Sequence, residues 1–313
     1  MAAGEGWSEL RAELPRMAAE LPPGLVSVDV PTAPDTHPGA SATRATAPAL
    51  GGGDAALGRA LAALWRDGAV VLRNAVSAAV CDGLLADMAP YLDAAGRHES
   101  TDALVDSRRP DAVVARSAHS HPIVAHPAVL WLCEALLGRQ ALYLSPEQLL
   151  DRARPDPRDD HEPRLPWVLE LAELIGVGSG SVAQELHFDG GYCGYDFHRL
   201  GVENTISTIW AVGSDFTDEI GATRCTCPFP TPLLSTSGLW ALAEPRSVCR
   251  VCLGSHRWPR ERRPMPEDSV PAVMPRGSVV VYTSFCVSSL FHPPPCSSSS
   301  SSCSSVLRCI CLA

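Results

Sequence analysis

The order of the apolar patterns along the chain constrains the fold more than any other feature. In the first half, apolar residues recur at helical spacing, as Leu57, Leu61 and Leu64 do. After residue 164 the apolar runs become short, and turns separate them. Helices followed by short strands predict an α+β, mainly β fold, in which N-terminal helices flank a β-sandwich or jelly roll.

The same patterns place individual elements. Residues 69–72 (AVVL) predict a short buried strand, and Ser77 is expected to cap the helix that follows it. A further helix is expected over residues 127–137, ending at Gly138. Later strands are expected over residues 184–189, 205–212 and 278–282.

Composition divides the chain into a central domain and two ends of different texture. Residues 1–55 hold one short possible helix and then a stretch rich in Pro, Ala, Thr and Gly, which predicts a flexible leader. The central domain is expected over residues 56–283, with the aperiodic segment 225–252 as an insertion. Residues 284–313 hold a serine run and scattered cysteines, and are expected to be a low-complexity tail. The insertion and the tail both have the texture of translated non-coding sequence.

Charge and hydropathy exclude several classes of partner. The formal net charge of −10 and the pI near 5.4 argue against a nucleic-acid or anionic-membrane surface. No apolar run reaches the ~18 residues that a membrane helix needs, and residues 1–20 lack the apolar core of a secretory signal. These features predict a soluble protein, cytoplasmic by default, with a peroxisomal location left open and the oligomeric state undetermined.

His187 and Asp189 form the candidate metal site. Residues i and i+2 of a strand point to the same face, so these two side chains can converge on one ion. An imidazole and a carboxylate, completed by a second imidazole, make the facial triad of non-haem iron oxygenases. Three protein ligands on one face leave three positions, enough for a bidentate 2-oxo acid and dioxygen. The alternative is a histidine and an aspartate on a strand surface that bind no metal.

The sequence around this pair resembles the phytanoyl-CoA dioxygenase family. Its Q-x-x-H-x-D segment is similar to residues 184–192 (QELHFDGGY), and its W-x-A…T-x-E-N-G-A-x hairpin resembles residues 209–223. Three further segments are similar to family segments, in the family's order: 65–72 (WRDGAVVL), 254–258 (GSHRW) and 275–282 (PRGSVVVY). The resemblance therefore extends from about residue 57 to residue 283, apart from the insertion.

The resemblance implies a double-stranded β-helix, a cupin-like jelly roll, that binds Fe(II) at His187 and Asp189. With 2-oxoglutarate as cosubstrate, such a protein hydroxylates a small organic or lipid-like substrate. Trp210 matches a family position that lines the cosubstrate pocket. Gln184 falls near the iron, where it is expected either to contact substrate or cosubstrate or to be a solvated strand residue. His256 is expected to be structural and to stabilise its own loop.

Beyond Tyr282 the chain departs from the family's pattern. The family continues with a second iron-binding histidine and then with an arginine that pairs the far carboxylate of 2-oxoglutarate. Here His292 is the only later histidine and Arg308 the only later arginine, and neither has the expected neighbours. A chain without these parts, and without the strand that carries them, is expected to be poorly stable and weakly active or inactive.

Three interpretations of function therefore stay open. The first is a phytanoyl-CoA dioxygenase-like hydroxylase that is incomplete as written. The second is a catalytically inactive jelly-roll protein that binds a ligand or partner, or a defective gene model. The third is a zinc-binding interaction protein, because two close pairs of thiols could hold a tetrahedral ion: Cys225, Cys227, Cys249 and Cys252.

Overall fold

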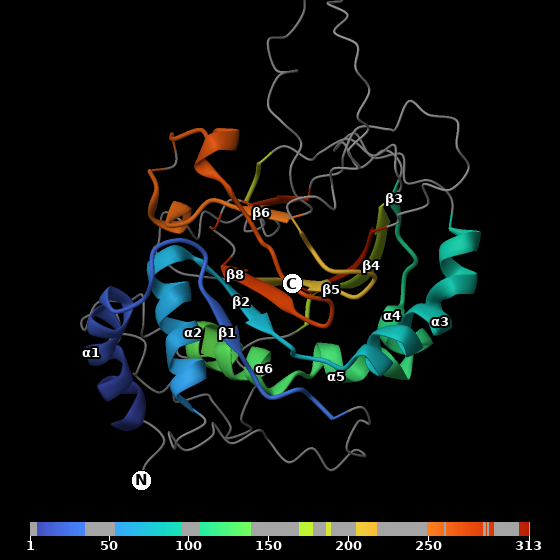
Figure 1. Cartoon of the computed structure of the whole chain (residues 1–313), viewed down its shortest axis with the longest axis horizontal. Helices are drawn as coiled ribbons and strands as arrows, with labels where there is room; N and C mark the ends of the chain where they lie inside the picture. Colours follow the sequence, from blue (N-terminus) through green and yellow to red (C-terminus); the bar gives the residue numbers. More distant parts are fainter. Residues whose placement is uncertain are drawn as a thin grey trace, which may run out of the picture.

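The computed structural model of the chain describes residues 5–34, 54–95, 107–138, 169–177, 186–188, 205–217, 249–259, 261–283, 286, 288–290 and 307–312. Six α-helices are found there: α1 (Glu5–Ala19), α2 (Asp54–Asp67), α3 (Ala78–Ala94), α4 (Val113–Arg116), α5 (His121–Val124) and α6 (Pro127–Cys133). No helix in this part of the chain is long and apolar enough to cross a membrane. The helices lie along one side of a mixed sheet, so the expected combination of helices and β-structure is confirmed (Figure 1).

The strands form a large and a small sheet. Ten strands are described: β1 (Ser27–Asp29), β2 (Ala69–Arg73), β3 (Ser107–Arg108), β4 (Ala172–Val177), β5 (Ile206–Ala211), β6 (Cys249–Val251), β7 (Val270–Pro271), β8 (Val279–Thr283), β9 (Ser288–Leu290) and β10 (Leu307–Leu312). The large sheet has the order β1-β2-β8-β5-β10-β4-β3, and the small sheet has the order β7-β6-β9. Only β1 and β2 pair in parallel; every other described pairing is antiparallel.

His187 extends the small sheet beyond β9. Its backbone N–H donates to the carbonyl O of Ser288 at 3.0 Å, and the Ser288 N–H donates back to the His187 carbonyl O at 2.9 Å. From β4 onward the chain therefore alternates between the sheets. It runs from β4 in the large sheet to His187 in the small one, returns to β5, crosses to β6 and β7, and returns to β8 before β9 and β10.

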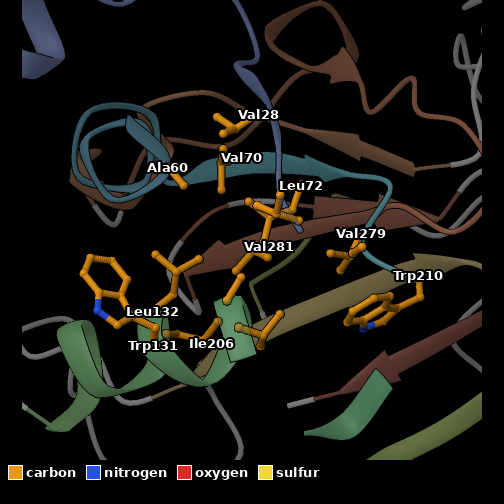
Figure 2. Packing of buried hydrophobic residues seen from close by; sticks show 14 of the residues in the cluster. Val28, Ala60, Val70, Leu72, Trp131, Leu132, Ile206, Trp210, Val279 and Val281 are labelled. Atoms are coloured by element: carbon orange, nitrogen blue, oxygen red, sulfur yellow. The ribbon is translucent and has the colours of Figure 1, made fainter. Parts of the chain in front are cut away.

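The two faces of the large sheet pack against different partners. On one face, Leu72, Trp210 and Val281 belong to the cluster that the helices cover, and Figure 2 shows this packing. On the other face, their neighbours Val71, Ile209 and Val280 belong to a cluster shared with the small sheet. Successive residues of a strand point to opposite faces, which explains this division.

The N-terminal segment packs into the core, which differs from the flexible leader expected for residues 1–55. Leu10, Leu14 and Ala18 are buried on one face of α1, and β1 extends the large sheet beside β2. The Arg66 guanidinium donates to the carbonyl O atoms of Ala18 (3.2 Å) and Leu21 (3.0 Å) near the end of α1. The four-residue spacing of the apolar side chains buries this helix, whatever the breakers that follow it. Residues 35–53 lie outside the described residues.

The chain after residue 224 also contributes more strands than its composition suggests. Strand β6 lies within the expected insertion 225–252, and it forms the centre of the small sheet. Strands β9 and β10 lie within the expected tail 284–313. Strand β10 runs between β5 and β4, with Ile310 opposite both Trp210 and Leu174. The loss of a strand that we expected from the sequence is therefore not observed.

Candidate metal centre

His187 is the one predicted iron ligand within the described residues. His187 is partly buried, and its two backbone hydrogen bonds with Ser288 hold it at the edge of the small sheet. The neighbouring Phe188 is 41% exposed. Asp189 and Gln184 lie outside the described residues, so the convergence of His187 and Asp189 on one ion stays a prediction.

No complete set of metal ligands is found among the described residues, because no three His, Cys, Asp or Glu side chains there are placed to hold an ion. His292 lies outside them, and of Arg308 only the backbone is described, paired opposite Gly176. The prediction that iron binds at His187 therefore rests on Asp189 and on any further ligand outside these residues.

The thiols of the zinc interpretation are only partly described. Cys225 and Cys227 lie outside the described residues. Cys249 is buried in the cluster between the sheets, and Cys252 is buried beside it. Burial raises the pKa of the Cys252 thiol to about 12, with Asp268 adding to the effect. The zinc interpretation stays a prediction, because two of its four thiols lie outside the described residues.

Trp210 lies on the helix side of β5 rather than between the sheets. Its side chain is fully buried, and its indole Nε1–H donates to the Thr208 Oγ1 at 3.1 Å. The indole and the His126 ring, at the start of α6, have centroids 5.6 Å apart. The neighbours Ile209 and Ala211 instead face the small sheet, on whose border His187 lies. These are packing contacts, and the cosubstrate-lining role expected from the resemblance stays a prediction.

His256 is structural, as expected from its turn. Its Nε2 lies 3.3 Å from the Trp65 carbonyl O at the end of α2, and Arg257 also donates to this carbonyl. A Cβ added to Gly68, whose φ is +77°, would lie 2.5 Å from the His256 Nδ1. The turn therefore packs tightly on the Asp67-Gly68 corner, where the backbone N–H of Gly254 donates to the Asp67 carbonyl O at 2.6 Å.

Sequence reasoning missed His126, which joins α6 to the segment after β2. Its Nε2–H donates to the Ala75 carbonyl O at 2.9 Å, and its Nδ1 accepts from the Ala128 N–H at 3.2 Å. Burial lowers the pKa of this imidazole to about 4. Its position directly before Pro127, at the start of a helix, was the available signal, since this is where a side-chain cap is needed.

Sequence reasoning also missed an ion pair between Arg109 and Glu173. Arg109 follows β3, and its Nη1 lies 3.7 Å from the Glu173 Oε2; the two side chains are 23% and 21% exposed. Glu173 and Ile175 are two residues apart on β4, so their side chains point to the same face of the sheet. Ile175 packs between the sheets. The pair therefore lies on the face of the large sheet that is turned away from the helices.

Comparisons with known proteins give structural likeness alone. No protein-family model matches the chain, and a search of curated proteins finds no match. Among solved structures, the non-heme α-ketoglutarate-dependent epimerase SnoN from nogalamycin biosynthesis is similar with a TM-score of 0.49 and 18% identity, over 82% of this chain and 81% of that one. SnoN in complex with Fe³⁺, α-ketoglutarate and nogalamycin RO gives 0.49 and 15%, over 82% of each chain. The non-heme α-ketoglutarate-dependent carbocyclase SnoK gives 0.48 and 12%, over 85% and 84%. At these values the likeness assigns no chemistry to this chain.

Proposed function

We propose that this chain is a non-haem Fe(II)/2-oxoglutarate-dependent oxygenase on a double-stranded β-helix, similar to phytanoyl-CoA dioxygenases and acting on a small organic or lipid-like substrate. The observation that carries the proposal is the strand order. Counted from β4, with the His187 segment as the second strand, the large sheet contains the order 6-3-8-1 and the small sheet the order 5-4-7-2. Two four-stranded antiparallel sheets, between which the chain crosses back and forth in this order, are typical of a jelly roll.

The position of His187 in this order supports iron binding. The histidine lies on the second strand and pairs with Ser288 of the seventh, and Asp189 follows two residues later. If the strand continues to Asp189, both side chains lie on the same face. Fe(II) held there, together with 2-oxoglutarate, would supply the oxidative chemistry.

The chain's own residues would position the reactants and exclude water. The sheet fixes the His187 backbone through its two hydrogen bonds to Ser288. The side chains that meet between the sheets form a buried apolar cluster, which includes Ile209, Phe216 and Val280. Such a cluster keeps water away, and this strengthens the electrostatic contacts made beside it. Gln184, which precedes His187 by three residues, is proposed to contact the substrate or cosubstrate.

A second candidate is a jelly-roll protein that binds a ligand without catalysis. The sequence favours it, because neither His292 nor Arg308 has the neighbours expected of the second iron-binding histidine and of the 2-oxoglutarate arginine. Under this alternative the fold and the apolar cluster between the sheets are kept, but ferrous iron is not retained.

Metal titration under anaerobic conditions separates the two candidates. We expect one Fe(II) per chain, with binding weakened at least tenfold by His187→Ala and by Asp189→Ala. His119→Ala is the matched control, because His119 is 42% exposed and pairs with Asp87 of α3. Conversion of 2-oxoglutarate to succinate by the iron-loaded chain is the second readout. Wild-type protein that binds no iron, or that binds it equally well after both substitutions, would overturn the oxygenase proposal.

A further inference from the structure

The face of the large sheet toward the small sheet carries a cation whose hydrogen bonding is incomplete. Arg108 reaches to the helix side, where its Nη1 donates to the Leu92 carbonyl O of α3 at 3.3 Å. The next residue, Arg109, approaches Glu173 on the opposite face. Arg109 is thus set apart from its neighbour by the alternation of side chains along an extended chain (Figure 1 shows β3 beside β4).

The contact between Arg109 and Glu173 is an ion pair without a short hydrogen bond. Its N–O distance of 3.7 Å exceeds the ~3.2 Å upper limit of ordinary N–H···O bonds. The Arg109 Nε is buried and has no hydrogen-bond partner among the described residues. A buried donor without an acceptor is costly, so the site favours an added acceptor over a further cation.

We propose that Arg109 binds a carboxylate group of a small-molecule ligand between the sheets. A guanidinium offers two edges, each of which can hold a planar carboxylate through two parallel hydrogen bonds. Glu173 lies beside Nη1, so the edge formed by Nε and Nη2 is the one left to the ligand. The Arg109 side chain as a whole is 23% exposed, although its Nε is buried.

Glu173 has a specific part in this arrangement. Its carboxylate holds the guanidinium through charge, and it also repels a second carboxylate that approaches the same cation. Removal of the Glu173 charge should therefore strengthen anion binding, whereas removal of the Arg109 charge should weaken it. If the pair only stabilised the fold, neither substitution would produce this opposite response.

The ligand carboxylate could come from the cosubstrate, 2-oxoglutarate, or from the substrate. Naming 2-oxoglutarate rests on the proposed function, whereas the carboxylate site itself does not. Glutarate is the first probe because it carries two carboxylates and lacks the 2-oxo group that would bind a metal. A competition with 2-oxoglutarate then separates the sources, because a shared site requires that the two exclude each other.

The test is calorimetric titration of the metal-free full chain with glutarate. We expect the dissociation constant to rise about tenfold to a hundredfold in Arg109→Gln and to fall in Glu173→Gln. Arg108→Gln is the matched control, since that side chain faces α3, and its affinity should equal that of the wild type. Near-ultraviolet circular dichroism identifies any variant that has lost its packing.

Three results would overturn the proposal: no glutarate binding at millimolar concentration by the wild type, unchanged affinity in Arg109→Gln, or weaker binding in Glu173→Gln. These measurements use no iron, so they are independent of the oxygenase proposal. If the chain fails to bind iron but the variants change glutarate affinity as expected, the carboxylate site is supported and the oxygenase proposal is not. If the chain binds iron but the variants leave glutarate affinity unchanged, the carboxylate site is contradicted.

Discussion

Two buried histidines should make the free energy of unfolding depend steeply on pH. His126 is 1% exposed and His256 is 9% exposed. Desolvation lowers the pKa of each imidazole from 6.5 to about 4; for His256, the charge of Arg257 adds to this effect. The His126 Nδ1 already accepts a hydrogen bond from Ala128, and the His256 Nδ1 is buried without a partner among the described residues. Neither site offers an added proton an acceptor.

The sign of the effect follows from the direction of these shifts. Below about pH 6.5 these two histidines bind protons in the unfolded chain but not in the folded chain. The free energy of unfolding therefore falls as the pH decreases, and it levels off near pH 4. A difference of two to three pKa units corresponds to about 3 kcal/mol for each histidine over the full range, and to about 2 kcal/mol each at pH 5. Two such residues remove a large part of the ~5–15 kcal/mol that keeps a domain folded.

Urea unfolding at pH 7.5 and pH 5.0 measures this loss. The wild type should lose about 4 kcal/mol from these two histidines between the two conditions. The double variant His126→Gln/His256→Gln starts less stable, but it should lose correspondingly less on acidification because glutamine does not titrate. His119→Gln is the control, since His119 is 42% exposed. An equally steep pH dependence in the double variant and the wild type would refute the reasoning.

Three further perturbations test the fold and the site. Gly277→Ala should lower the free energy of unfolding by about 3 kcal/mol or more, because φ is +82° and the new Cβ would lie 2.4 Å from the Val76 carbonyl O. Gly254→Ala is the control, because φ there is +73° and no atom lies within 4 Å of the added Cβ. In the same urea titration it should lower the free energy of unfolding by less. A chain ending at Ser305 should melt at a lower temperature and less cooperatively by circular dichroism, since it lacks the strand between β5 and β4; an unchanged melting curve would contradict that strand order. Trp210→Phe should cost about 1 kcal/mol through the lost bond to Thr208 and leave 2-oxoglutarate affinity unchanged; a selective loss of that affinity in calorimetry would return Trp210 to the cosubstrate pocket.

The sequence predicted elements whose pattern is local. The spacing of Leu57, Leu61 and Leu64 predicted α2, and the run 69–72 predicted β2. The Ser77 side chain caps α3 as expected, accepting from the Val80 N–H at 3.2 Å. In each case the residues that determine the element lie within a few positions of one another, so one turn of helix or one strand carries the whole signal.

The sequence could not assign the faces of β5. All six residues from Ile206 to Ala211 are buried, because helices cover one face of the strand and the small sheet covers the other. A strand buried on both faces need not alternate between polar and apolar residues, and its sequence does not reveal which face holds a ligand. For this reason Trp210 could be placed by resemblance and not by pattern.

Strand β10 illustrates the same limit over a longer distance. The segment LRCICL follows serine-rich, low-complexity sequence, yet it pairs with β4 and with β5, which lie about a hundred or more residues earlier. Local composition describes what surrounds a segment in the sequence, whereas the sheet supplies the partners that make it a strand.

The oxygenase proposal combines two independent lines of reasoning. An H-x-D pair depends on the identity of two residues, whereas the strand order depends on backbone pairing across the whole domain. A chance H-x-D pair could fall on any of the ten described strands or between them. Here the histidine lies on the second strand of the alternating order, beside the seventh. Any additional ligand from the seventh strand or its flanks would therefore enter next to His187, so the residues around Ser288 are where a completed metal site should be sought.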